Sequence, residues 1–159
     1  MNRPYPFYPA WDGKKASPLI LKAAELLMKR YPGTKNLGTY VNRDMRDKPG
    51  QKSVHATGYA LDLGYKDEKQ ARTIWDFLLA HSKELGVCEL HWYGYGSHGA
   101  GFRCSRGEGK NGVLIYVDAA SSAGKGGPWL HLELDNKYAG VDGGDVSRWE
   151  DVFRSTKPA

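Results

Sequence analysis

The sequence that decides the fold runs Ser53-Val-His55-Ala-Thr-Gly58-Tyr-Ala60-Leu-Asp62. Its second half alternates apolar and other side chains, which predicts a strand over residues 59–64 with one face in a core. Asp62 lies on the other face, and His55 comes just before the strand. Imidazole and carboxylate groups are usual zinc ligands, so this stretch is a candidate half of a metal site. Gly58 permits a tight bend between the two candidate ligands.

A second informative stretch lies near the other end of the chain and reads Trp129-Leu-His131-Leu-Glu133-Leu. Strict alternation predicts a strand over residues 129–135 whose leucines all face one way. His131 and Glu133 then share the opposite face with Trp129. A strand with a leucine side and a Trp-His-Glu side is typical of a sheet that has a core on one face and a cleft on the other.

The remaining sequence predicts helices and strands in a mixed order. We expect helices over 18–31 and 67–85, strands over 37–43, 87–93 and 113–118, and a short closing helix that Asp145 caps. Polar residues 44–54, Gly-rich residues 94–112 and small residues 119–127 are predicted loops. Residues 1–16 are expected to wrap the surface. This order predicts one α+β domain over 1–159, with helices on one face of a mainly antiparallel sheet.

Composition restricts the partners. The chain has 159 residues and a net charge of +5, but its basic residues are scattered among acidic ones, so we expect no nucleic-acid patch. No apolar run has the length of a membrane helix or of a signal-peptide core, so we expect no membrane insertion and synthesis in the cytoplasm. Cys88 and Cys104 are too few for a thiolate zinc site; they are either two reduced thiols or one disulfide. We also expect a monomer.

Taken together, the two stretches resemble a known family of zinc peptidases. The pattern Ser-x-His-x-x-Gly-x-Ala-x-Asp, followed by a histidine on a later strand, resembles the D-alanyl-D-alanine carboxypeptidases (VanY type) and L-alanyl-D-glutamate peptidases. Several phage endolysins belong to this family, and the hedgehog signalling domain shares its fold. All five fixed positions of the first motif are present in the chain. The resemblance implies a hedgehog-like fold and one zinc ion held by His55, Asp62 and His131.

The resemblance also implies catalytic residues, and here the chain departs from the family. Arg43 matches the family's substrate-binding arginine on the strand before the motif, with Arg46 as the alternative. The family places an acid or a histidine two or three residues before the last ligand, where this chain has Trp129 and Pro128. Glu133 is therefore the first candidate for the catalytic base. It could equally support one of the zinc ligands. Asp118 and His91 are the other candidates, with Glu89 sharing the cleft face of His91.

Two functions follow from the resemblance. The first is zinc-dependent hydrolysis of a peptide bond in bacterial peptidoglycan, by a phage endolysin that reaches the cell wall after a separate lysis step releases it. The second is a wall-binding module that keeps zinc but has lost activity, because the acid before His131 is missing. A metal-free nucleic-acid binder is a third class. The bond that is cut and the choice between carboxypeptidase and endopeptidase stay open.

Overall fold

The computed structural model describes residues 15–46, 48–118, 127–135 and 146–157, and these form an α+β fold. The helices are α1 (Pro18–Arg30), α2 (Glu68–Ala80) and α3 (Val146–Ser155). The strands are β1 (Lys35–Gly38), β2 (Asp44–Met45), β3 (Lys48–Lys52), β4 (Ala60–Gly64), β5 (Val87–Trp92), β6 (Ala100–Arg103), β7 (Val113–Ile115) and β8 (Trp129–Leu134). Two short 3₁₀ helices, η1 (Val54–Thr57) and η2 (Gly109–Gly112), complete the described elements.

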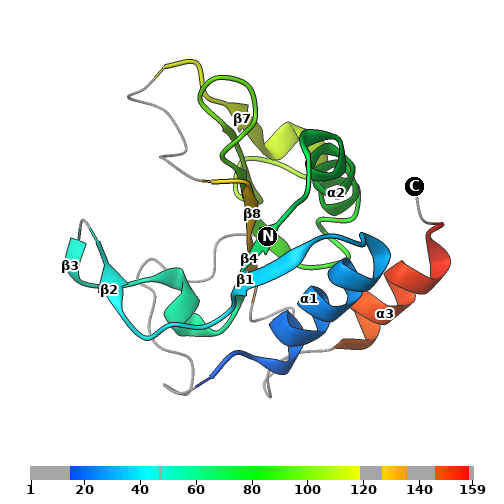
Figure 1. Cartoon of the computed structure of the whole chain (residues 1–159), viewed down its shortest axis with the longest axis horizontal. Coiled ribbons are helices and arrows are strands. Elements are labelled where there is room, and N and C mark those ends of the chain that lie inside the picture. Colours follow the sequence, from blue (N-terminus) through cyan, green and yellow to red (C-terminus); the bar gives the residue numbers. More distant parts are fainter. Residues whose placement is uncertain (1–14, 47, 119–126, 136–145, 158–159) are drawn as a thin grey trace.

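Six of the strands form one antiparallel sheet in the order β1-β4-β8-β5-β6-β7. The late strand β8 therefore lies between β4 and β5, which precede it in the sequence by many residues. Strands β2 and β3 form a separate antiparallel hairpin. Figure 1 shows this hairpin standing away from the sheet, on the side opposite the helices. The predicted α+β class with a mainly antiparallel sheet is confirmed.

The sheet has one apolar face, as the alternation predicts. The core residues that its central strands contribute are at most 2% exposed and are Leu61, Leu63, Leu90, Trp92, Leu130, Leu132 and Leu134. Burying a leucine side chain contributes about 1.5–3 kcal/mol, so this one face anchors the fold. Because successive side chains of a strand alternate between faces, the residues between these leucines must all lie on the other face.

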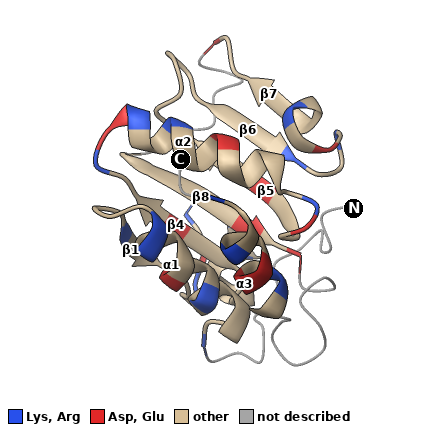
Figure 2. Ribbon diagram, turned by 90° about the vertical axis from the view of Figure 1, so that its right-hand side faces the viewer, with Lys and Arg blue, Asp and Glu red and all other residues tan. Residues whose placement is uncertain are grey.

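The three helices cover the apolar face (Figures 1 and 2). Helix α1 begins where Ser17 accepts a hydrogen bond from the backbone N–H of Ile20, 3.2 Å away, and Asp67 caps α2 in the same way. The buried stripe of α2 is the predicted one, Ala71, Ile74, Trp75, Leu78 and Leu79. Figure 2 marks Lys, Arg, Asp and Glu positions along all three helices.

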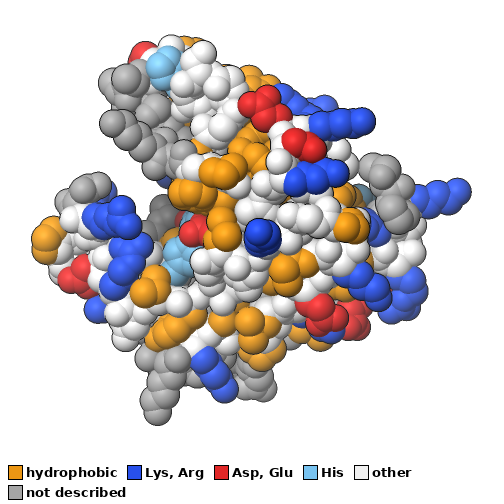
Figure 3. Space-filling view, viewed as in Figure 1, with side chains coloured by type: hydrophobic (Ala, Val, Ile, Leu, Met, Phe, Trp, Pro, Cys, Tyr) orange, Lys and Arg blue, Asp and Glu red, His pale blue; other side chains and the backbone are white. Residues whose placement is uncertain are grey.

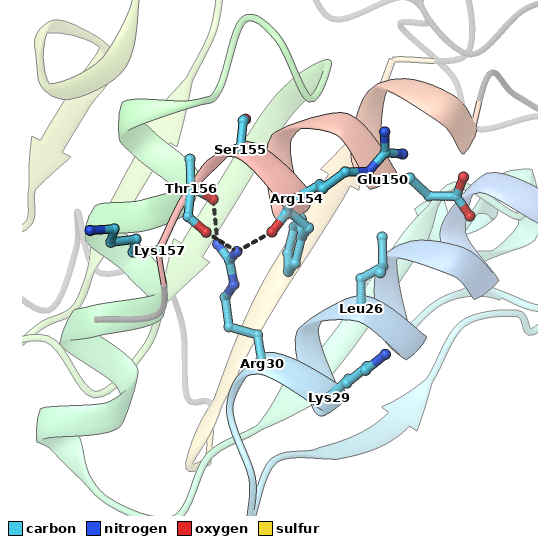
Figure 4. A pocket seen from close by; sticks show the side chains of 9 residues that line it. Leu26, Lys29, Arg30, Glu150, Arg154, Ser155, Thr156 and Lys157 are labelled. Atoms are coloured by element: carbon cyan, nitrogen blue, oxygen red, sulfur yellow. Dashed lines mark hydrogen bonds between the residues drawn. The ribbon is translucent and has the colours of Figure 1, made fainter.

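Arg30 joins α1 to the end of α3 (Figure 4). Its guanidinium donates to Oγ1 of Thr156 at 2.7 Å, to the Thr156 carbonyl at 2.7 Å and to the Phe153 carbonyl at 2.5 Å. The same group lies over the rings of Phe77 and Phe153, at 4.8 and 4.4 Å. Arg30 thus satisfies carbonyls that the last turn of α3 leaves without helical partners.

Replacing Arg30 with alanine is expected to lower the free energy of unfolding by about 2–4 kcal/mol, since it removes charge-assisted hydrogen bonds and two cation–π contacts. Chemical denaturation measures this. Lys29, exposed on the same helix, is the matched control, and Lys29→Ala should change stability by about 0.5 kcal/mol or less. Equal stabilities of the two variants would contradict the role given to Arg30.

Several predicted boundaries were wrong. The strand predicted over 37–43 lies at Lys35–Gly38, and the predicted loop 44–54 contains the β2–β3 hairpin and the first residue of η1. Asp44 stabilises this polar hairpin by accepting from the backbone of Gly50 at 2.9 Å and pairing with Lys52 at 3.2 Å. The hairpin is held by polar contacts, and its sequence does not alternate apolar and polar residues. The pattern that predicted the other strands is therefore absent from it.

The other differences concern α2 and the Gly-rich region. Helix α2 ends at Ala80 rather than near residue 85, and turns follow to Gly86, whose positive φ of 67° leads into β5. The predicted loop 94–112 contains β6, and the strand predicted over 113–118 ends at Ile115. Most of the surface segment 1–16, most of loop 119–127 and the cap Asp145 lie outside the described residues.

Candidate metal centre

His55 is positioned by a short 3₁₀ helix rather than by a strand. It lies in η1, and Gly58 ends this element with a φ of 75°, in the left-handed region that favours glycine. The N–H of Gly58 donates to the carbonyl of His55 at 3.2 Å. The glycine of the motif is thus required by the backbone, which turns here from His55 into β4.

Asp62 and His131 face each other across neighbouring strands. They are direct partners in the register of β4 and β8, and Nδ1 of His131 lies 2.8 Å from Oδ1 of Asp62. Nε2 of His55 lies 3.3 Å from Oδ2 of Asp62. One ligand atom from each of the three residues lies within 4.8 Å of the others. His55 and His131 are each 8% exposed, so the two imidazoles are largely shielded from water, whereas the Asp62 carboxylate is partly exposed.

These three side chains could hold a metal ion. Tetrahedral coordination at about 2.1 Å places ligand atoms about 3.4 Å apart, which is close to the separations between Asp62 and the two imidazoles. Two imidazoles and one carboxylate form a donor set that binds first-row divalent metals, and three protein ligands leave one position open. The donor types and their mutual distances, all within 4.8 Å, therefore fit a metal ion.

Electrostatics couples the three residues. Burial by itself raises the pKa of Asp62, but hydrogen bonds with His131 and His55 outweigh burial and hold this pKa well below its ordinary value. Burial lowers the pKa of His131, but hydrogen bonds with Asp62 and Glu133 raise it to about 10. Asp62 is thus a carboxylate at neutral pH, as metal binding requires. A cation bound at Nδ1 of His131 would take the place of its proton.

Glu133 contacts the far side of the His131 ring. Its Oε1 lies 3.1 Å from Nε2 of His131, and the carboxylate is 3% exposed. With Nδ1 directed to Asp62, Nε2 is the nitrogen that donates to Glu133. A carboxylate on the second nitrogen of a ligating histidine fixes its tautomer and its ring orientation. The geometry therefore favours Glu133 as a positioning residue for His131.

The floor of the site continues onto β5 and β6. Glu89 and His91 are the register partners of Glu133 and His131. Oε2 of Glu89 lies 3.0 Å from Nε2 of His91, and its Oε1 lies 3.1 Å from Nε of Arg103. The rings of His91 and His131 are 6.1 Å apart. A second carboxylate–imidazole pair thus lies beside the first.

Gly101 makes room for the His91 ring. It is the register partner of His91 on β6, and a Cβ atom there would lie 2.8 Å from Nδ1 of His91 and 2.7 Å from the hydroxyl of Tyr116. Both distances are too short for a carbon atom. Any larger residue at this position would displace the ring. The sequence does not single out this glycine, because it lies in a Gly-rich segment.

The three candidate ligands line a cleft of about 510 Å³. Figure 3 shows this hollow, with histidine and acidic side chains at its base and Lys and Arg side chains on the bordering hairpin. Arg43 and Lys48 line it from the hairpin side, and Arg103 lines it from β6. The backbone N–H of Ser53 donates to the carbonyl of Arg43 at 2.9 Å, which holds Arg43 beside the motif.

The structure brings together most of the predicted site residues. His55, Asp62, His131, Glu133, His91 and Arg43 all line the cleft. Arg43 does so from an exposed loop, so the prediction that a strand carries it was wrong. Asp118 is exposed three residues beyond the end of β7 and does not line the cleft, and the strand predicted to carry it ends too early. Arg46 also lies outside the lining.

Tyr93 and Arg103 are among the cleft residues that were missed from the sequence. Tyr93 follows Glu89 and His91 in the alternation of β5, stacks on His91 and contacts Trp129 at its edge, so the alternation itself could have identified it. Burial and the nearby carboxylates, chiefly Asp62, raise the pKa of Tyr93, so it is a hydroxyl donor at neutral pH. Arg103 lies on a strand that no sequence pattern indicated.

Comparisons of the chain with protein-family models, with curated proteins and with solved structures found no match. The functional inference therefore depends on the motif and on the geometry of the cleft. Within the described ranges, no helix has the length and apolar character needed to cross a membrane.

Proposed function

We propose that this protein is a zinc-dependent peptidase that hydrolyses a peptide bond in the stem or cross-link peptides of bacterial peptidoglycan, as a phage endolysin. The observation that carries the proposal is the convergence of His55, Asp62 and His131, from three separate elements, at the base of an open cleft. The resemblance of the motif to the D-alanyl-D-alanine peptidase family supports both the zinc and the substrate class. The cationic cleft wall suits peptides that carry free carboxylates.

Zinc held by these residues would lower the pKa of a coordinated water toward neutrality and polarise the scissile carbonyl. Arg43, at the cleft wall, would donate hydrogen bonds to the carbonyl oxygen as negative charge develops on it. Glu133 keeps the His131 ring in the orientation that directs Nδ1 toward Asp62. Tyr93 supplies a further hydroxyl donor inside the cleft.

A proton acceptor is still needed, and His91 is the residue we assign. It lies across the strand pair from His131, and Glu89 accepts from its Nε2, as a carboxylate does in a catalytic carboxylate–histidine pair. The nitrogen left to accept the proton is Nδ1, which is buried beside Gly101 and has no hydrogen-bond partner among the described residues. The position that the family uses for its base holds Pro128, which cannot accept a proton. Glu133, the other candidate, already uses its Oε1 to hold His131.

Incubating the zinc-loaded protein with purified peptidoglycan tests the proposal. Mass spectrometry of the soluble products should show new amino and carboxyl termini within the peptide part and an intact glycan, and the products identify the bond. Products are expected to disappear when a chelator removes the metal and to return when zinc is added back. Pull-down of the protein by peptidoglycan without any cleavage would instead favour a wall-binding module.

Replacing Arg43 with alanine is expected to lower turnover about 10²–10³-fold, by analogy with the loss of one oxyanion-hole donor. Zinc content and thermal stability should stay unchanged, because the Arg43 side chain is exposed and its one described hydrogen bond is local, to the Asp44 carbonyl. Arg106→Ala, in an exposed turn outside the cleft, is the matched control. Full activity of Arg43→Ala would contradict the role given to Arg43.

A further inference from the structure

The two cysteines are neighbours across the β5–β6 strand pair. Glu89 is the register partner of Arg103, so Cys88 and Cys104 form the next pair along. The backbone N–H of Cys104 donates to the carbonyl of Cys88 at 3.0 Å, which confirms that the two backbones run side by side at this point. Cross-strand neighbours have Cα atoms about 4.5–5.5 Å apart, inside the range of about 4.4–6.8 Å that a disulfide spans.

The surroundings of the two thiols also suit a bond. Cys88 is fully buried, Cys104 is partly buried against the main hydrophobic core, and both are free thiols in this structure. Direct partners on neighbouring antiparallel strands project to the same face of a sheet. The described hydrogen bond of the Cys88 thiol is a weak one to the Glu133 carbonyl, at 3.4 Å. Turning this side chain toward Cys104 therefore costs little.

We propose that Cys88 and Cys104 form a disulfide that locks β5 to β6 when the protein is exposed to a low-molecular-weight disulfide oxidant. The bond closes a loop of 15 residues, 89–103. This loop carries Glu89, His91 and Arg103, the part of the cleft floor beyond the metal ligands. The cross-link therefore restrains the β5–β6 side of the cleft, which contributes no ligand to the proposed metal ion. The proposal does not depend on the peptidase function.

The oxidation is a two-step exchange with glutathione disulfide. The Cys104 thiolate, the more accessible of the two, attacks one sulfur of the oxidant and releases one glutathione thiolate. The Cys88 thiolate then attacks the Cys104 sulfur of this mixed disulfide and releases the second glutathione. Two cysteine thiols are oxidised, one glutathione disulfide is reduced to two glutathiones, and the two cysteine protons end on the glutathione thiolates. Because burial raises the pKa of both thiols, the exchange needs mildly alkaline buffer.

The test uses the full chain, first reduced and then incubated with glutathione disulfide, against a reduced control. Samples are unfolded, alkylated and analysed by intact mass and peptide mapping. Oxidised protein should have lost two hydrogen atoms, take no alkyl group and yield one cross-linked peptide pair that contains both cysteines. Its melting temperature should rise by about 5–10 °C, as expected for a cross-link that closes a loop of this length in a domain of this size.

Cys104→Ser is the control variant, because its side chain is only partly buried and the change removes one sulfur. It should form no intramolecular bond, and oxidant should leave its melting temperature unchanged. Two alkylatable cysteines in oxidised wild-type protein, or a glutathione adduct on Cys104 alone, would overturn the proposal. A cross-link without a rise in melting temperature would overturn the locking role. Neither readout uses zinc or peptidase activity, so these failures are distinct from failure of the proposed function.

Discussion

Replacing Asp62 with asparagine is expected to abolish hydrolysis by removing the metal. Asp62 makes a polar contact with both other residues, at 2.8 Å to Nδ1 of His131 and 3.3 Å to Nε2 of His55. An amide keeps its shape but carries no charge, so it is a poor metal ligand and cannot balance the positive charge of the ion. Elemental analysis after dialysis should find the variant without zinc, and its activity on peptidoglycan should equal that of chelated wild-type protein.

The matched control for this change is Asp76→Asn. Asp76 is exposed on α2, which covers the opposite face of the sheet, so this variant loses one carboxylate and leaves the cleft intact. It should keep wild-type zinc content and activity. A zinc-loaded, active Asp62→Asn protein would remove Asp62 from the ligand set and with it the proposed centre.

His91→Gln is expected to lower turnover about 10²–10⁴-fold, the usual contribution of general base catalysis, with zinc content unchanged. Glutamine retains a polar side chain of similar length but cannot accept the proton at neutral pH. Glu133→Gln should behave differently. Because Glu133 holds Nε2 of His131, its loss should weaken zinc binding about 10–100-fold, with turnover restored at saturating zinc.

Competition titration with a zinc chelator and turnover at saturating zinc separate these two roles. If Glu133→Gln binds zinc normally yet loses about 10²–10⁴-fold in rate, Glu133 is the base and the assignment of His91 is wrong. If both variants bind zinc normally and turn over at the wild-type rate, neither residue accepts the proton.

The parts of the fold that the sequence predicts well are those with strict alternation. The leucines of β8 and the apolar residues of β4 have one possible face each, so the faces of Asp62 and His131 follow directly from them. The same argument extends along β5 to Tyr93. Helix caps and apolar stripes likewise predicted α1 and α2, because both patterns depend only on residues three or four positions apart.

The parts that the sequence did not predict depend on contacts between distant residues. No local pattern indicates that β8 lies between β4 and β5, yet this order puts Glu89 opposite Glu133 and His91 opposite His131. The role of Glu133 depends on which nitrogen of His131 faces Asp62, and only the structure shows this. Strand β6 lies among glycines, so the ion pair of Arg103 with Glu89 and the pairing of the two cysteines were hidden as well.

The central claim is that His55, Asp62 and His131 hold one zinc ion. Elemental analysis of the protein, after reconstitution with zinc and exhaustive dialysis, tests it most directly. The proposed function predicts about one zinc per chain in the wild-type protein and none in Asp62→Asn or His55→Ala. Folded wild-type protein that retains no zinc after reconstitution, or variants that retain as much as the wild type, would contradict the claim.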